Sequence, residues 1–196
     1  MLTALLPLLT SLGFHPVVVP RTWVDGTPCI VMNADRLPLA TRKSPLDSVT
    51  FKLKNKEVKI CYGRPATRGR KMFGGVVPFG MLWRTGANEP TMIHTGIPLD
   101  LAGIKVKAGS YSLYTVPGPT EWVIIVNSSI TQWGIESEYT PLMESLEVGR
   151  ATVKSETVEK FAEIFTITAT LHGGEAEEVV LTWENTRVAI PIRIGQ

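Results

Sequence analysis

Alternation of apolar and polar residues with a period of two most constrains what this 196-residue chain can fold into. In residues 49–54 and 57–62, Val, Phe, Leu, Ile and Tyr side chains alternate mainly with Thr, Lys and Glu. Successive side chains of a strand point to opposite faces of its sheet, so each segment is predicted to be a strand. Asn55-Lys56 between them favours a hairpin turn.

Further strands are predicted along the rest of the chain, whereas residues 128–146 break the rhythm and suggest a long loop with one helical turn. The predicted strands are 91–95, 99–101, 104–107, 110–116, 121–127, 165–171, 179–184 and 188–192, with a hairpin turn at His172–Glu175. Apart from the N-terminus, no ten-residue segment has the 3.6-residue period of a helix. The fold class is therefore predicted to be all-β, an antiparallel sandwich of jelly-roll-like type.

The stretch from Tyr62 to Asn88 differs from its surroundings in charge and in backbone requirements. It carries five basic residues and no acid, while the rest of the chain sums to a charge of −3, and it holds six of the 17 glycines. Its apolar residues would be too much surface to leave in water, so disorder is not expected. A loop this long is usually functional when it is ordered. The stretch is therefore predicted to be a long, ordered Gly/Arg-rich loop that forms a binding site.

Residues 1–43 are predicted to be an N-terminal extension that adds one or two edge strands, and residues 44–196 to be the β domain. The apolar start, 1–14, has the length of a signal-peptide core but no basic residue before it, which favours a packed helix or strand and a cytoplasmic location. Cys29 and Cys61 are expected to be buried thiols, with a disulfide as the alternative if the protein is exported.

Composition and motifs exclude several classes of function. The net charge is only +2, so no global positive field indicates a nucleic-acid partner, and no apolar run approaches the ~18 residues of a spanning helix. His15, His94 and His172 have no neighbours at metal-ligand spacing, so no metal site is predicted. No recognised catalytic or nucleotide-binding motif occurs, and no cofactor is predicted.

The candidate ligand-binding residues lie in the basic stretch. Guanidinium groups offer planar donor forks to carboxylate or phosphate, an indole offers a stacking face, and Asn and Glu add a polar end. The candidates are Arg64, Arg70, Trp83, Arg84, Asn88 and Glu89. The structural alternative, that the arginines pin the loop by bonding its backbone carbonyls, is given equal weight. Arg84 should point away from the side of Trp83.

The segments YGRPATRGRKMFGGVVPFGMLWRTGANEPT, AGSYSLYTVPGPTEWVIIVN, QWG and LTWENTRVAIPI resemble the uncharacterised bacterial family catalogued as domain of unknown function 2911. The resemblance covers about residues 44–192. It implies a β-rich fold and, from the signals common in such proteins, an exported location. It implies no activity. Its signature positions are Arg64, Pro65, Gly69, Arg70, Gly74, Pro78, Gly80, Trp83, Arg84, Gly86, Asn88, Gly109, Tyr111, Trp122, Asn127 and Trp183.

Three functions remain open from the sequence. The first is binding of a small polar or anionic molecule, of the carbohydrate or carboxylate class, in a pocket built by the 62–89 loop. The second is an enzyme of unrecognised type, in which Glu89 or Glu184 acts as acid or base beside Arg84. The third is an assembly protein whose strand edges pair with a partner or form a homo-oligomer.

Overall fold

The computed structural model describes residue 26, residues 28–172 and residues 175–196. Strands dominate this part of the chain. The helical segments are η1 (Leu39–Thr41), η2 (Glu136–Glu138) and α1 (Pro141–Glu144). The strands are β1 (Leu46–Leu53), β2 (Lys56–Gly63), β3 (Thr91–Thr95), β4 (Leu99–Leu101), β5 (Ile104–Val106), β6 (Gly109–Val116), β7 (Glu121–Asn127), β8 (Glu147–His172) and β9 (Glu175–Ile194). The all-β prediction is confirmed.

The predicted hairpin of β1 and β2 is present, and its turn lies one residue earlier than predicted. Leu53 pairs with Lys56, and the two residues between them, Lys54 and Asn55, have φ angles of 46° and 62°. Positive φ at both central residues is the signature of the two-residue turn that matches the twist of paired strands. Along both strands the apolar side chains of the alternating pattern face the core.

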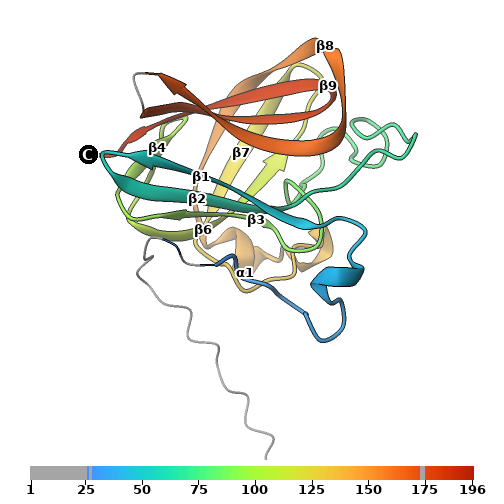
Figure 1. Ribbon diagram of the computed structural model, residues 1–196, viewed down its shortest axis with the longest axis horizontal. Helices are drawn as coiled ribbons and strands as arrows, with labels where there is room; N and C mark the ends of the chain where they lie inside the picture. Colours follow the sequence, from blue (N-terminus) through green and yellow to red (C-terminus); the bar gives the residue numbers. More distant parts are fainter. Residues whose placement is uncertain (1–25, 27, 173–174) are drawn as a thin grey trace, which may run out of the picture.

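Within the described residues, the nine strands are hydrogen-bonded in one antiparallel order, β1-β2-β3-β6-β7-β8-β9-β4-β5. The structure thus does not divide them into the two sheets of the predicted sandwich. Figure 1 shows how the sheet bends: the long β8–β9 hairpin arches over the layer formed by β1, β2, β3, β6 and β7. One hydrophobic core fills the space enclosed by this bend, with residues from every strand.

Strands β8 and β9 differ most from the prediction. The chain is already extended from Glu147, where no strand was predicted, and β9 runs unbroken through the region expected to separate two strands. Register shifts between β8 and β9 flank the pair Ala162 and Glu184, and Glu184 has a φ of 51°. Such a bulge re-aims a side chain without ending the strand. The predicted turn at His172–Glu175 contains residues 173 and 174, which lie outside the described residues.

An aromatic cluster occupies the core beneath the basic loop. Phe73 and Trp83 come from the loop, Trp122 from β7, Phe165 from β8 and Trp183 from β9. Phe73 meets the three indoles edge-on at centroid distances of 5.7, 4.8 and 5.7 Å. Burial of rings this large and edge-to-face contact both stabilise the fold, so the loop is part of the core rather than an appendage.

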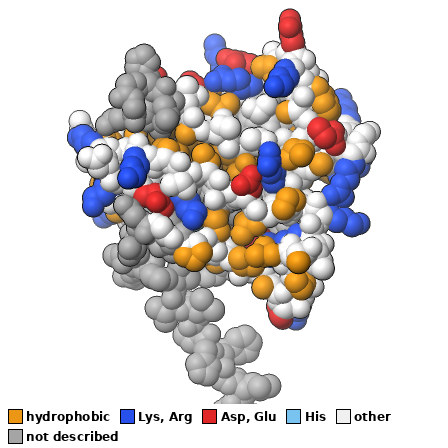
Figure 2. Space-filling model, viewed as in Figure 1, with side chains coloured by type: hydrophobic (Ala, Val, Ile, Leu, Met, Phe, Trp, Pro, Cys, Tyr) orange, Lys and Arg blue, Asp and Glu red, His pale blue; other side chains and the backbone are white. Residues whose placement is uncertain are grey.

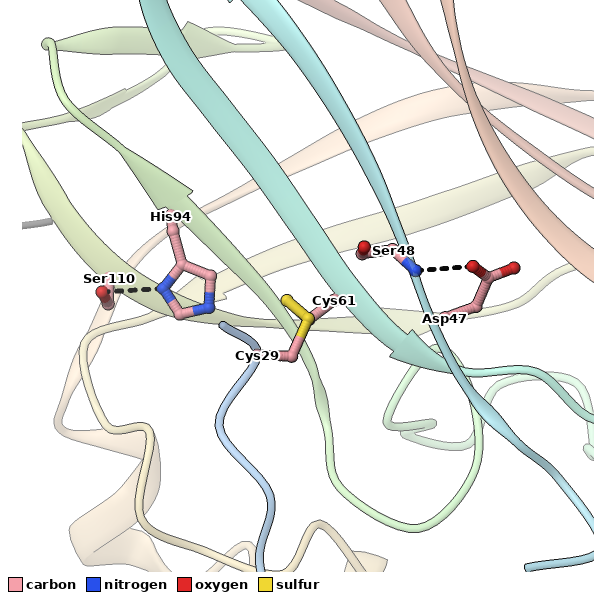
Figure 3. Close-up of a disulfide and its surroundings, with 6 residues drawn as sticks. All are labelled: Cys29, Asp47, Ser48, Cys61, His94 and Ser110. Atoms are coloured by element: carbon pink, nitrogen blue, oxygen red, sulfur yellow. Dashed lines mark hydrogen bonds between the residues drawn. A yellow bond between two sulfur atoms is a disulfide. The ribbon is translucent and has the colours of Figure 1, made fainter. Parts of the chain in front are cut away.

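The described part of the N-terminal extension, 28–43, contains η1 and no strand. The predicted edge strands and the predicted helix or signal at 1–14 otherwise fall outside the described residues. A disulfide joins Cys29 to Cys61 on β2, so the prediction of two buried thiols is wrong (Figure 3). The sequence separation of 32 residues gave no sign of this pairing, because β2 lies next to the extension only in the folded chain.

Residues 128–146 form the predicted long loop, with η2 and the single turn α1. Thr140 caps α1 by accepting a hydrogen bond from the amide of Met143, and Pro141 occupies the first turn, where its missing N–H is not needed. Within the described residues, no helix is long and apolar enough to cross a membrane.

Candidate functional site

The basic loop, residues 64–90 between β2 and β3, is held to the sheet along its length. The backbones of Trp83 and of Thr115 on β6 exchange two hydrogen bonds. The Trp83 amide donates to the Thr115 carbonyl at 2.7 Å, and the Thr115 amide donates to the Trp83 carbonyl at 2.9 Å. The backbone amide of Thr67 donates a hydrogen bond to the carbonyl oxygen of Glu163 on β8. The loop is therefore ordered because its buried side chains and its backbone groups both find partners in the domain.

Glu184 fixes the middle of the loop. Its two carboxylate oxygens accept hydrogen bonds from the amides of Met72 and Phe73, at 2.8 and 3.0 Å. The positive φ of Glu184 at the β9 bulge aims the side chain at these amides. Glu184 thus positions Phe73 in the aromatic cluster.

The end of the loop, 83–88, makes a tight and strained turn against β2. Thr85 is fully buried with a φ of 57°, which is rare for a β-branched residue. A Cβ at Gly63 would lie 1.8 Å from the carbonyl oxygen of Ala87, so only glycine allows this close approach. Strain of this kind clusters at functional sites, where the surrounding structure enforces it.

A cavity of about 490 Å³ opens between this turn, the middle of the loop and β9. Its volume falls within the ~300–1,000 Å³ of small-molecule sites. Eleven of its fifteen lining residues are apolar or glycine, and the polar ones are Ser44, Arg70, Arg84 and Glu136. The apolar ones are Pro65, Met72, Val76, Val77, Pro78, Met81, Leu82, Trp83, Gly86, Ala87 and Trp183.

Three of the six predicted site residues line this cavity: Arg70, Trp83 and Arg84. Arg70 is exposed at the surface, and its Nε donates to the carbonyl oxygen of Thr67 at 3.0 Å. Trp83 is 5% exposed, and its indole N–H donates to the Gly86 carbonyl. Little of its ring is therefore available for contact with a ligand.

Arg84 is the half-buried cation of the cavity. Its Nη1 donates to the Asn88 carbonyl oxygen at 3.3 Å, while its Nε is buried and has no hydrogen-bond partner within the described part of the chain. Its charge acts on the Tyr114 hydroxyl, although burial dominates and raises the pKa of Tyr114 to about 12. Arg84 therefore has unused capacity to bind an acceptor.

The other three predicted residues do not line the cavity. Arg64 pairs with Asp47 at 3.2 Å on the β1 side of the loop. Asn88 donates from its side chain to the Ser44 carbonyl at 2.9 Å, and this bond holds Ser44 against the cavity. Glu89 is 3% exposed and belongs to a different constellation.

Glu89 forms a buried ion pair with Arg42 of the N-terminal extension. The guanidinium donates to both carboxylate oxygens, at 2.7 and 2.9 Å, and the amide of Met32 adds a third bond at 2.7 Å. Arg42 also donates to the carbonyl oxygens of Leu37 and Met32. This bidentate pair fastens the extension to the domain. Sequence reasoning missed Arg42, and the only available signal was the unpaired acid at Glu89.

A histidine and a serine lie near the disulfide on the face of the sheet covered by the extension. The Nδ1 atom of His94 on β3 is 2.8 Å from the hydroxyl of Ser110 on β6 (Figure 3). Burial, together with the charge of Lys59, lowers the pKa of His94 to about 4. Among the residues that the structure describes, no group of three His, Cys, Asp or Glu side chains is arranged to hold a metal ion.

The fold and the cavity define an all-β protein in which a basic, glycine-rich loop packs against one curved sheet and leaves a small cavity beside two arginines. Residues 44–192 match the family described as "Protein of unknown function (DUF2911)", which is more than half of the chain. The chain therefore belongs to the DUF2911 family. Comparisons with curated proteins and with solved structures give no significant match.

Proposed function

We propose that this protein binds a small polar or anionic molecule in the cavity beneath the basic loop. The observation that carries the proposal is Arg84, a half-buried cation on the cavity wall whose one side-chain hydrogen bond among the described residues runs from Nη1 to the Asn88 carbonyl oxygen, at 3.3 Å. A guanidinium has five N–H donors, so the Nη groups of Arg84 keep capacity for an acceptor brought by a ligand, and charge-assisted hydrogen bonds of this kind are strong. Convergent polar groups in an apolar cavity are the usual inventory of a ligand site.

The enzyme hypothesis receives less support. It assigned acid–base chemistry to Glu89 or Glu184 beside Arg84, but both carboxylates are engaged inside the fold and neither lines the cavity. The carboxylate that does line the cavity, Glu136, is exposed on η2. It therefore lies in water rather than in a site that excludes water.

Assembly through strand edges also has little specific support. The terminal strands of the sheet, β1 and β5, lie against β9 and β8 respectively, so the bend partly covers both edges. On the face shown in Figure 2, acidic, basic and hydrophobic side chains are interspersed. Association into a homo-oligomer remains a prediction, to be measured by light scattering during size-exclusion chromatography.

The binding proposal is tested by blocking the cavity. Val76 lines the cavity and is 53% exposed, so Val76→Trp should fill its mouth without disturbing the core. The matched control is Val148→Trp, at an exposed valine of β8 that does not line the cavity. The readout is the melting temperature in the presence of a panel of small organic acids and sugars.

A true ligand should raise the melting temperature of the wild type and of Val148→Trp, and should have no effect on Val76→Trp. A compound that stabilises all three proteins equally binds elsewhere. If that were the only behaviour in the panel, or if no compound stabilised the wild type, the proposed function would be wrong.

A further inference from the structure

The chemistry of the cavity wall distinguishes between the two ligand classes that the sequence leaves open. Carbohydrate sites combine an exposed aromatic face with several side chains that both donate and accept hydrogen bonds. Carboxylate sites need fewer groups, above all an arginine fork with an apolar surface beside it. The following inference rests on the proposed function and narrows it.

The aromatic rings of the cavity expose very little surface. Trp83 and Trp183 are 5% and 2% exposed, and they stack on each other with an interplanar angle of 16° and centroids 5.9 Å apart. Phe73 contacts both rings edge-on. A sugar ring therefore has no indole face on which to stack, although the wall remains strongly apolar.

Two of the four polar side chains that line the cavity are cationic donors. Arg70 and Arg84 offer only N–H groups, Ser44 offers one hydroxyl, and Glu136 supplies the one carboxylate on the wall. A polyhydroxylated ligand would bury many hydroxyls with few partners, which is unfavourable. A carboxylate, which is purely an acceptor, is complementary to this set.

The two arginines differ in depth, and this difference gives the ligand an orientation. Arg84 is half-buried with a sealed Nε, whereas Arg70 is exposed and is held in place by the carbonyl oxygens of Thr67 and Ala66. The apolar side chains beside them include Met81 and Val76, which are 57% and 53% exposed. A ligand with an apolar body would cover these exposed side chains while its charged head meets Arg84.

Glu136 limits the charge of the ligand. With Arg70 and Arg84 it leaves the wall at a net charge of +1. A monoanion balances that charge, whereas a second negative charge would be repelled by Glu136. We propose that the cavity binds a monocarboxylate carried on an apolar body, with the carboxylate at Arg84.

Calorimetric titration with matched probes tests this assignment. The probes are octanoate, its uncharged isostere octanamide, octyl phosphate and glucose. Octanoate should bind the wild type about tenfold or more tightly than octanamide, because a charge-assisted hydrogen bond is lost in the amide. Arg84→Met should abolish this preference, whereas the control Arg68→Met, at an exposed arginine of the same loop that does not line the cavity, should retain it.

Glu136→Gln provides an independent readout of the charge limit. It should improve binding of octyl phosphate by severalfold and change octanoate binding much less. Equal affinity for octanoate and octanamide, or preferred binding of glucose, would overturn the carboxylate assignment; if Val76→Trp blocked that binding, the proposed function would still stand. If none of the four probes bound, and no compound of the panel of organic acids and sugars stabilised the wild type, both the carboxylate assignment and the proposed function would be wrong.

Discussion

Arg42 and Arg84 differ in what surrounds their guanidinium groups, although both lie close to the end of the basic loop. The side chain of Arg42 is fully buried and donates to both oxygens of Glu89. Arg84 donates to one backbone carbonyl at 3.3 Å and otherwise faces the cavity. The first is engaged in holding the fold together, and the second is available to a ligand.

This difference predicts opposite outcomes for the same substitution. Arg84→Met keeps an apolar stem and removes a guanidinium whose hydrogen bond to the Asn88 carbonyl is long, at 3.3 Å, so the melting temperature should change by no more than about 2 °C. Arg42→Met leaves the Glu89 carboxylate buried without its cation and should cost about 3–5 kcal/mol, which lowers the melting temperature by about 10 °C or more. Thermal melts of the two variants measure both effects. A large fall for Arg84→Met would make Arg84 a structural pin.

The buried His94 predicts a dependence of stability on pH. Its pKa is about 4 in the folded protein because burial, assisted by Lys59, disfavours the charged form. An unfolded histidine titrates near 6.5, so between these values the unfolded chain binds a proton that the folded chain does not. The free energy of unfolding should therefore fall as the pH drops from about 6.5 to about 4, by on the order of 3 kcal/mol from this group.

Urea unfolding of the wild type and of His94→Gln at pH 7 and pH 4.5 isolates this contribution, since all other groups titrate in both proteins. The wild type should lose more stability than the variant over this interval. Equal losses would show that His94 becomes protonated without leaving its buried position, and would contradict the prediction.

At the scale of elements, a disulfide and a buried ion pair are two strong contacts that fasten the N-terminal extension to the domain. Cys29 forms the disulfide with Cys61 on β2, and Arg42 forms the ion pair with Glu89 at the end of the basic loop. The Ser44 carbonyl, just after the extension, accepts from Asn88. These contacts join the extension, β2 and the turn at the cavity into one unit.

Removing the disulfide should release this unit in part. The double variant Cys29→Ala/Cys61→Ala should lose about 3 kcal/mol, the usual contribution of a disulfide closing a loop of roughly this length. The disulfide and the ion pair hold the same segment. When the cysteine double variant is combined with Arg42→Met, the loss in free energy of unfolding should therefore be clearly less than the sum of the separate losses. Urea unfolding of the wild type, of the two separate variants and of their combination gives the coupling free energy. Additive losses would mean that the two fastenings act independently.

How far the sequence predicted these elements depends on the side chains that each strand buries. The β1–β2 hairpin was predictable because its buried positions carry large apolar residues such as Phe51 and Ile60. The first part of β8 was not, since its inward positions include Gly149, Ala151 and Ser155, which are half-buried and give no apolar alternation. A break between two strands was predicted at residues 185–187, directly after the bulge at Glu184, but β9 continues through them.

Some residues of the candidate site could be predicted from the sequence and others could not. Arg70, Trp83 and Arg84 were identified because they are close in sequence and chemically distinctive. Glu89 has the same local appearance but belongs to a pair with Arg42, 47 residues away, and Glu136 reaches the cavity from another loop. Pairings between distant segments depend on how the sheet bends, and no local pattern contains that information.

At the scale of the whole molecule, the basic loop and the curved sheet share one core. Phe73, in the middle of the loop, touches Trp83, Trp122 and Trp183, and so joins the loop to β7 and β9. Glu184 holds the Phe73 amide from the β9 bulge. The cavity exists only while these contacts hold, because Trp83 and Trp183 form part of its wall.

This arrangement predicts that the loop and the sheet unfold in a single transition, which two phenylalanines of the loop can test. Phe73 is 5% exposed, so Phe73→Ala should lower the free energy of unfolding by about 3–5 kcal/mol through the cavity left in the aromatic cluster. Phe79 is 41% exposed, and Phe79→Ala should cost about 1 kcal/mol or less. Urea unfolding followed by tryptophan fluorescence and by far-ultraviolet circular dichroism should give coincident curves for both variants. If fluorescence changed at lower urea than circular dichroism in Phe73→Ala, the loop would detach while the sheet stayed folded, and the two would be separate units.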